Sequence, residues 1–148
     1  MDLRNGVLEI NGTAITPQTS QIEFEAVFSS ELFSAFTSPK HPDKSLYTAE
    51  KPVICGDMKA RVEVLFQNAI INEVEIICAD EELRLLISSW NEKYEQRLAM
   101  HKEWLSEQLG EPTSQTKYST IYSFDWGQIS VEDNRRDLSS SIVMRLKD

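Results

Sequence analysis

The chain has 148 residues, of which 41% are hydrophobic and 26% are charged, and its formal net charge is -9. This length predicts one domain over residues 1–148, with enough apolar side chains for a packed core. The acidity excludes nucleic acid as the expected partner, because phosphate binding needs clustered Lys and Arg. A membrane is excluded as well, because no apolar run approaches the roughly 20 residues of a membrane span.

The N-terminal part of the chain predicts a hairpin followed by a helix. In residues 7–15 apolar and polar side chains alternate before Asn11-Gly12, a dipeptide that is the strongest two-residue signal for a hairpin turn. Ser20 and Glu23 then form a capping box, in which each side chain can bond a backbone amide of the other residue. We expect this helix to run from Gln21 to Phe36, with an apolar side made of Ile22, Phe24, Ala26, Phe28, Leu32, Phe33 and Phe36.

Residues 37–52 show no periodicity and contain three prolines, so we expect a loop there. Loops of this length are uncommon in compact domains. Two interpretations stay open, a plain surface crossover and a functional or mobile segment.

Two antiparallel strands are predicted next, over residues 58–66 and 71–78. In both segments every second residue is apolar, which is the period of a strand with one buried face. Glu73 and Glu75 fall on the opposite face of the second strand, as Glu63 does on the first. A solvated face with cross-strand ion pairs would explain these acids.

A long helix is predicted to begin at Asp80, which can cap it, and to end at Leu109, before Gly110 and Pro112. Its apolar stripe consists of Leu83, Leu86, Ile87, Trp90, Tyr94, Leu98, His101, Leu105 and Leu109. His101 on this stripe is expected to be a hydrogen-bonded core residue. Trp104 lies off the stripe, so it either packs under a loop or is exposed for a partner.

The C-terminal third predicts strands over residues 118–126, 128–132 and 139–146, with a polar corner at 133–137. Gly127 is expected to turn the chain or to make a bulge. The predicted fold is therefore α+β, an antiparallel sheet of about five to seven strands packed against one long helix and one shorter helix.

The residues that carry catalysis in other proteins are sparse. His41 and His101 are the two histidines, and neither lies near a nucleophile motif in the sequence. Cys55 and Cys78 lack the paired spacing of zinc ligands, and we expect them to be buried free thiols. The prediction is a protein that is not an enzyme and that holds no cofactor and no metal. A small enzyme that uses two carboxylates remains a third hypothesis.

The acidity has two interpretations, general solubility and a surface that meets a basic protein. The second interpretation gives a set of candidate partner-binding residues, chosen because they are acids or aromatics on expected surface positions. They are Glu73, Glu75, Glu103, Trp104, Glu107, Asp125, Trp126, Asp133 and Asp137. For the aromatic bend at Trp126 and the corner at 133–137, a purely structural role is the alternative.

Leu109-Gly110-Glu111-Pro112 after a helix, followed by an aromatic strand that ends in Trp126-Gly127, resembles the binding modules of BamE-like and beta-lactamase-inhibitor-like proteins. In overall character, a small acidic α+β chain without a catalytic set resembles the bacterial immunity proteins that neutralise toxin domains. That resemblance implies an inhibitor that occludes a basic toxin domain. The first residues lack the pattern of a secretion signal, so we expect the cytoplasm. The alternative function is a self-associating assembly module that uses a strand edge or Trp104.

Overall fold

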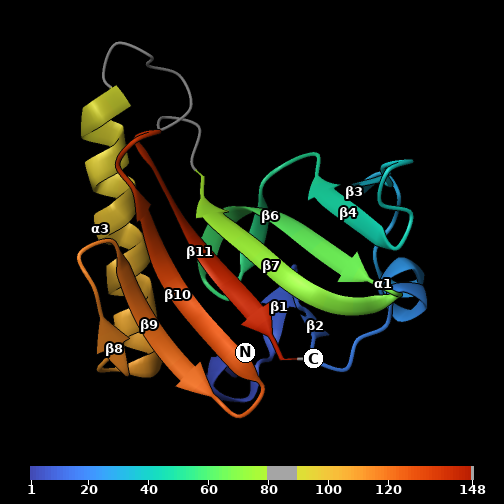
Figure 1. The fold of residues 1–148 in the computed structure, drawn as a ribbon, viewed down its shortest axis with the longest axis horizontal. Helices are drawn as coiled ribbons and strands as arrows, with labels where there is room; N and C mark the ends of the chain where they lie inside the picture. The colour runs from blue at the N-terminus through green and yellow to red at the C-terminus, as the bar shows by residue number, and fades with distance from the viewer. Residues whose placement is uncertain (80–89, 148) are drawn as a thin grey trace.

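A computed structural model describes residues 1–79 and 90–147 of the chain. One antiparallel sheet of eleven strands dominates it, in the order β2-β1-β5-β6-β7-β11-β10-β9-β8, with β3 and β4 attached beside β6 (Figure 1). The strands are β1 (Leu8–Ile10), β2 (Thr13–Ile15), β3 (Phe33–Phe36), β4 (Lys44–Ala49), β5 (Val53–Cys55), β6 (Met58–Gln67), β7 (Ile70–Cys78), β8 (Ser114–Gln115), β9 (Ser119–Phe124), β10 (Gly127–Asn134) and β11 (Ser139–Leu146). Within the described residues the α-helices are α1 (Gln21–Val27) and α3 (Trp90–Leu109), and a short 3-10 helix, η1, spans Leu3–Asn5.

The α+β class and the antiparallel sheet are confirmed, but the prediction of five to seven strands was too low. The strands that sequence analysis missed are short, apart from β4. Residues 33–36, 53–55 and 114–115 offer too few positions for an alternation to stand out. These short strands exist because longer neighbours supply their hydrogen-bonding partners.

The predicted helix from Gln21 to Phe36 was wrong in length, because α1 ends at Val27. Its start is confirmed, since the Ser20 hydroxyl accepts from the Glu23 amide at 3.2 Å and donates to the Glu23 carboxylate at 3.1 Å. After α1, the Ser29 hydroxyl accepts from the Leu32 amide, a local bond that competes with helical hydrogen bonding. The chain then extends into β3, which leaves Phe36 64% exposed, outside the predicted apolar side.

Ile22 was also placed wrongly on the apolar side of this helix. Its side chain is 79% exposed, whereas Phe24 and Phe28, four positions apart, are buried. Phe24 is the buried residue of α1, and Ile22, two positions before it, therefore points to the opposite side of the helix.

The prediction of a loop over residues 37–52 was wrong for its second half. Lys44–Ala49 forms β4, paired with β3 on one side and with β6 on the other. Ser45, Tyr47 and Ala49 are the buried residues of this strand. Because two of the three are small or polar, their alternation does not show in a hydrophobicity pattern.

The strands predicted at 58–66 and 71–78 are confirmed as β6 and β7, each with one buried face. One edge of β6 serves two partners, because its first residues pair with β5 and its last residues pair with β4. The sheet therefore branches at β6. Its buried face belongs to one hydrophobic cluster that includes Val62, Val64, Val74 and Ile76.

The long helix packs on this buried face, over β7, β10 and β11 (Figure 1). In its described part the predicted stripe is confirmed, since Tyr94, His101, Leu105 and Leu109 are buried. The left-handed Gly110, with φ of 77°, follows its end as predicted. The predicted cap at Asp80 and the stripe residues Leu83, Leu86 and Ile87 lie outside the described residues. No helix in residues 1–79 and 90–147 combines the length and apolarity of a membrane span.

His101 joins α3 to two strands and is fully buried. Its Nε2 atom accepts from the Cys78 amide at 2.9 Å, and its Nδ1 atom lies 2.8 Å from the Ser140 hydroxyl. Because Nε2 is an acceptor, the ring is neutral and Nδ1–H donates to Ser140. Burial, and then the charge of Arg97, lowers the pKa of His101 to about 4. The prediction of a core histidine is confirmed, and Cys55 and Cys78 are buried free thiols as predicted.

We expect His101 to make the protein less stable as the pH falls. Its folded pKa of about 4 lies below the ordinary 6.5, so the unfolded chain binds more protons between these values and stability is lost in this window. From pH 7 to pH 5 the loss is about 2 kcal/mol. Urea unfolding of the wild type and of His101→Gln at both pH values measures it. The variant should show a pH dependence smaller by that amount, whereas His41→Gln, which changes the exposed histidine, should keep the wild-type dependence.

Gly127 opens β10 where the chain passes close to β11. A Cβ atom there would lie 2.1 Å from the Arg145 carbonyl oxygen, and the φ of 149° disfavours any other residue. Gly127→Ala should therefore lower the free energy of unfolding by at least about 3 kcal/mol in urea titration. Gly12→Ala is the matched control, because φ is 81° but nothing lies within 4 Å, so about 1 kcal/mol is expected. Equal losses would contradict the steric explanation.

Candidate functional site

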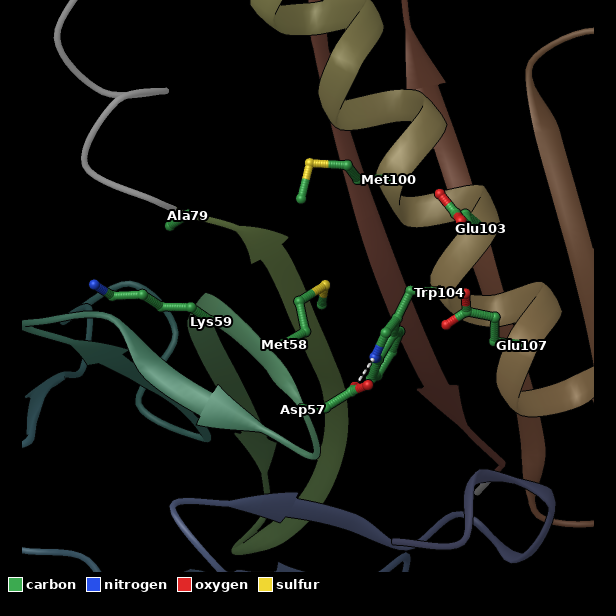
Figure 2. Close-up of a pocket in the computed structure, with 8 residues that line it drawn as sticks. All are labelled: Asp57, Met58, Lys59, Ala79, Met100, Glu103, Trp104 and Glu107. Carbon is green, nitrogen blue, oxygen red and sulfur yellow. Dashed lines mark hydrogen bonds between the residues drawn. The ribbon is translucent and has the colours of Figure 1, made fainter.

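A groove lies between α3 and the turn that joins β5 to β6 (Figure 2). Its volume is about 310 Å³. It brings together residues that are far apart in the sequence, because α3 crosses the buried face of the sheet beside this turn. The lining residues are Asp57, Met58, Lys59, Ala79, Met100, Glu103, Trp104 and Glu107.

Trp104 packs between α3 and the β5–β6 turn and is only 6% exposed. Its indole Nε1–H donates to the Asp57 carboxylate at 2.9 Å, as Figure 2 shows. Gly56, in the left-handed conformation with φ of 63°, makes the turn that presents Asp57. Of the two sequence-based alternatives, the structure therefore supports the one in which Trp104 packs under a loop.

The charges of the groove are mainly negative. Asp57, Glu103 and Glu107 contribute three carboxylates, and Lys59 contributes one ammonium group. Within the described residues none of these three carboxylates takes part in an ion pair. Glu103 and Glu107 are exposed on the same side of α3, one helical turn apart, where their mutual repulsion slightly destabilises the helix. A cation from outside would relieve that repulsion.

The apolar part of the groove comes from Met58, Met100 and the indole of Trp104. Met100 is 41% exposed, although it is large and apolar. Methionine side chains are flexible and polarisable, so they adapt to partners of different shape. The arrangement suits a chain segment with an apolar body and a positive end. In the described part of the chain, no group of three or more His, Cys, Asp or Glu side chains is placed to hold a metal ion.

Glu73 and Glu75 lie on the other face of the sheet, away from α3. Arg145 on β11 pairs with Glu73 at 3.2 Å and with Glu132 on β10 at 2.9 Å, which makes a cross-strand ion-pair network. Glu75 stands directly opposite Glu63. Burial, and then the charges of Glu63 and Glu73, raise the pKa of Glu75, and the nearby Arg145 lowers it. This surface is therefore partly neutralised from within the chain.

Asp125 and Trp126 lie in the turn between β9 and β10. The Trp126 indole donates to the Arg4 carbonyl at 3.0 Å, and the Arg4 guanidinium donates to the Leu109 carbonyl at the end of α3 at 2.8 Å. Trp126 also stacks on Phe124, with ring centroids 5.7 Å apart. Its contacts thus join the N-terminal segment to the sheet and the helix. Asp125 is exposed.

Asp133 and Asp137 flank the turn between β10 and β11. The Asp133 carboxylate pairs with the Arg135 side chain at 3.2 Å, and the Asp137 carboxylate accepts from the Asn134 amide at 2.9 Å. Arg135 also lies over the ring of Tyr118, with its guanidinium carbon 5.6 Å from the ring centroid. These contacts hold the turn locally.

The nine predicted partner-binding residues therefore lie in four separate places, and three of them, Glu103, Trp104 and Glu107, line the groove together. The other side of the groove, formed by Asp57, Met58 and Lys59, was not predicted, and neither was Met100. Nothing in the sequence signals that residues 57–59 lie beside α3, because that contact depends on how the helix crosses the sheet.

Comparison with protein-family models, curated proteins and solved structures gave no match for this chain.

The Trp104–Asp57 hydrogen bond should be a measurable link between α3 and the sheet. We expect a double-mutant cycle of Trp104→Phe and Asp57→Ala, followed by urea unfolding, to give a coupling energy of about 1.5 kcal/mol, because the acceptor is charged and the donor indole is buried. Asp125→Ala is the matched control, since Asp125 is an exposed aspartate, like Asp57, that lies in the turn between β9 and β10 and does not accept from the Trp104 indole. Its cycle with Trp104→Phe should give a coupling near zero. Equal couplings in the two cycles would contradict a direct bond.

Proposed function

We propose that this chain is a non-enzymatic binding protein that acts by occlusion, as an immunity-type inhibitor of a basic toxin domain. The carrying observation is the groove beside Trp104, where three carboxylates without an ion pair in the described chain surround an apolar floor. A Lys or Arg side chain of the partner would place its stem on Met58 and Met100 and its charge between Glu103 and Glu107. Such an inhibitor would act in the cytoplasm.

The groove supports this proposal better than the acidic sheet face does. Glu73 already pairs with Arg145, so a basic partner would have to replace an existing ion pair there. The two surfaces also lie on opposite faces of the sheet, so one compact partner domain cannot cover both. Glu75, whose pKa is raised, does not line the groove, so the carboxylate-enzyme hypothesis gains no support from this site.

A second candidate, self-association as an assembly module, rests on β3. In the described part of the chain this strand pairs with β4 alone, so its other edge is open, and Phe36 on it is exposed. Trp104 does not favour self-association, because it is buried within the chain. Sedimentation of the wild type and of Phe36→Ser separates this candidate, since an oligomer that Phe36→Ser dissolves would favour it.

The inhibitor proposal predicts that a gene adjacent to the gene for this chain encodes a basic partner protein. Proteins encoded by the adjacent genes, purified and titrated against this chain in a calorimeter, should include one whose affinity falls as the salt concentration rises. The double variant Glu103→Lys/Glu107→Lys should weaken that binding by at least about tenfold, because it replaces attraction by repulsion.

The control for that experiment is Glu95→Lys/Glu111→Lys, which makes the same change of net charge. Both residues are exposed and neither lines the groove. This variant should stay within about threefold of the wild-type affinity, as expected for screened distant charges. Equal losses in the two variants would show that net charge acts without the groove. If no adjacent product binds, the immunity role is wrong.

A further inference from the structure

Another cavity, of about 520 Å³, lies at the turn between β10 and β11 and shares no residue with the groove beside Trp104. Figure 1 shows this turn at the end of the hairpin that lies away from both chain termini. Three of the seven lining residues are arginines and two are acids, so the lining is positive although the whole chain carries a net charge of -9. The arginines are Arg135, Arg136 and Arg145, and Tyr118 is the aromatic residue of the lining.

Arg135 is held in place by a buried carboxylate and by an aromatic ring. Its Nε–H donates to the Asp133 carboxylate at 3.2 Å, and its guanidinium carbon lies 5.6 Å from the centroid of the Tyr118 ring. The Asp133 side chain is 6% exposed, and its other oxygen has no hydrogen-bond partner among the described residues, so releasing Arg135 would leave an uncompensated buried charge. The Arg135 side chain is 61% exposed, so a ligand from solvent meets the guanidinium group rather than the carboxylate.

Arg136 follows directly in the chain and offers all of its N–H donors. It is exposed and, within the described residues, its side chain forms no ion pair and no hydrogen bond. The turn that carries both arginines is closed by the Leu138 amide, which donates to the Arg135 carbonyl at 3.4 Å. The Asn134 side chain also donates across this turn, to the Asp137 carboxylate at 2.9 Å. Two neighbouring guanidinium groups with unused donors therefore line one cavity.

The second acid of the lining, Glu132, is satisfied within the chain. One of its carboxylate oxygens accepts from the Ser119 hydroxyl at 2.7 Å. The other accepts from the Ser130 hydroxyl at 2.8 Å and from the Arg145 guanidinium at 2.9 Å. Glu132 and Arg145 therefore compensate each other. The charge that lacks a partner in the described part of this cavity is that of Arg136, and it favours an anion.

We propose that this cavity binds a phosphate monoester, with Arg135 and Arg136 on the phosphate oxygens and the organic part of the ester beside Tyr118. A guanidinium group binds oxyanions through two parallel N–H donors, so a carboxylate with two oxygens satisfies one arginine. A phosphate monoester has three acceptor oxygens and nearly two negative charges, so it can use both. The cavity volume falls within the range of small-ligand pockets, about 300–1,000 Å³. This site is independent of the proposed inhibitor function, because it involves different residues and the opposite charge.

Amide NMR titration of the full chain tests the proposal with three probes, namely phenyl phosphate, the aromatic carboxylate benzoate, and a peptide that carries phosphoserine. Phenyl phosphate should give saturable shifts around residues 118 and 133–136 and bind about tenfold more tightly than benzoate, because it engages a second arginine. Arg136→Gln should weaken the binding of phenyl phosphate by about tenfold. Arg136 is an exposed turn residue, so the substitution leaves the core unchanged, and dispersed amide signals will confirm the fold.

Arg61→Gln is the matched control, because Arg61 on β6 is also exposed, forms no ion pair with another described residue and does not line the cavity. It should stay within about twofold of the wild-type affinity, as expected for a screened distant charge. Saturable shifts with phenyl phosphate would assign a free phosphate ester as the ligand, and shifts with the peptide alone would assign a phosphorylated protein. Equal affinity for phenyl phosphate and benzoate, equal losses in the two variants, or no saturable shift with any probe would overturn the proposal.

Discussion

The three-way contact of His101 with Cys78 and Ser140 decides where the long helix lies on the sheet. One neutral imidazole satisfies a backbone amide of β7 and a hydroxyl of β11 inside the core, where an unsatisfied polar group would cost about 1–3 kcal/mol. The helix cannot slide along the sheet without breaking both bonds. Trp104, one turn further along, is thereby brought beside Asp57, and the groove follows from that placement.

The negative charge of the chain is distributed in a way that net charge alone does not reveal. On the face away from α3, Arg145 links Glu73 and Glu132 across three strands, so those acids stabilise the sheet. In the groove, Asp57, Glu103 and Glu107 have no such partner among the described residues. The groove acids therefore favour association with a cation from outside, whereas the acids of the sheet face are already paired with Arg145.

The groove and the aromatic cluster beside α1, formed by Phe24, Phe28, Phe33 and Tyr47, differ in how their side chains are held. The groove joins a helix to a turn through one indole–carboxylate bond, and its methionines can adapt to a partner. The rings beside α1 are in mutual edge-to-face contact and almost fully buried, so they are a closed part of the core. An adaptable surface such as the groove suits a protein segment.

The sequence by itself determined the elements whose signals are local. The alternation in residues 58–66 and 71–78, the capping box at Ser20 and the glycine after Leu109 each act within a few residues, and each was predicted correctly. The apolar stripe of the long helix also placed His101 in the core. Local signals did not predict β4, because its buried residues are partly small or polar. They also did not predict the early end of α1, after which the Ser29 hydroxyl bonds a backbone amide.

Only the tertiary structure decided which residues meet. Residues 57–59 and the helix residues 103–107 are distant in sequence, and His101 brings them together by satisfying two strands at once. Likewise, β3 and β4 extend the sheet because the end of β6 offers unpaired backbone groups to β4, which no side-chain pattern records. The physical reason is the same in both cases. A site depends on contacts between distant segments, and those contacts are set by hydrogen bonding and packing across the whole sheet.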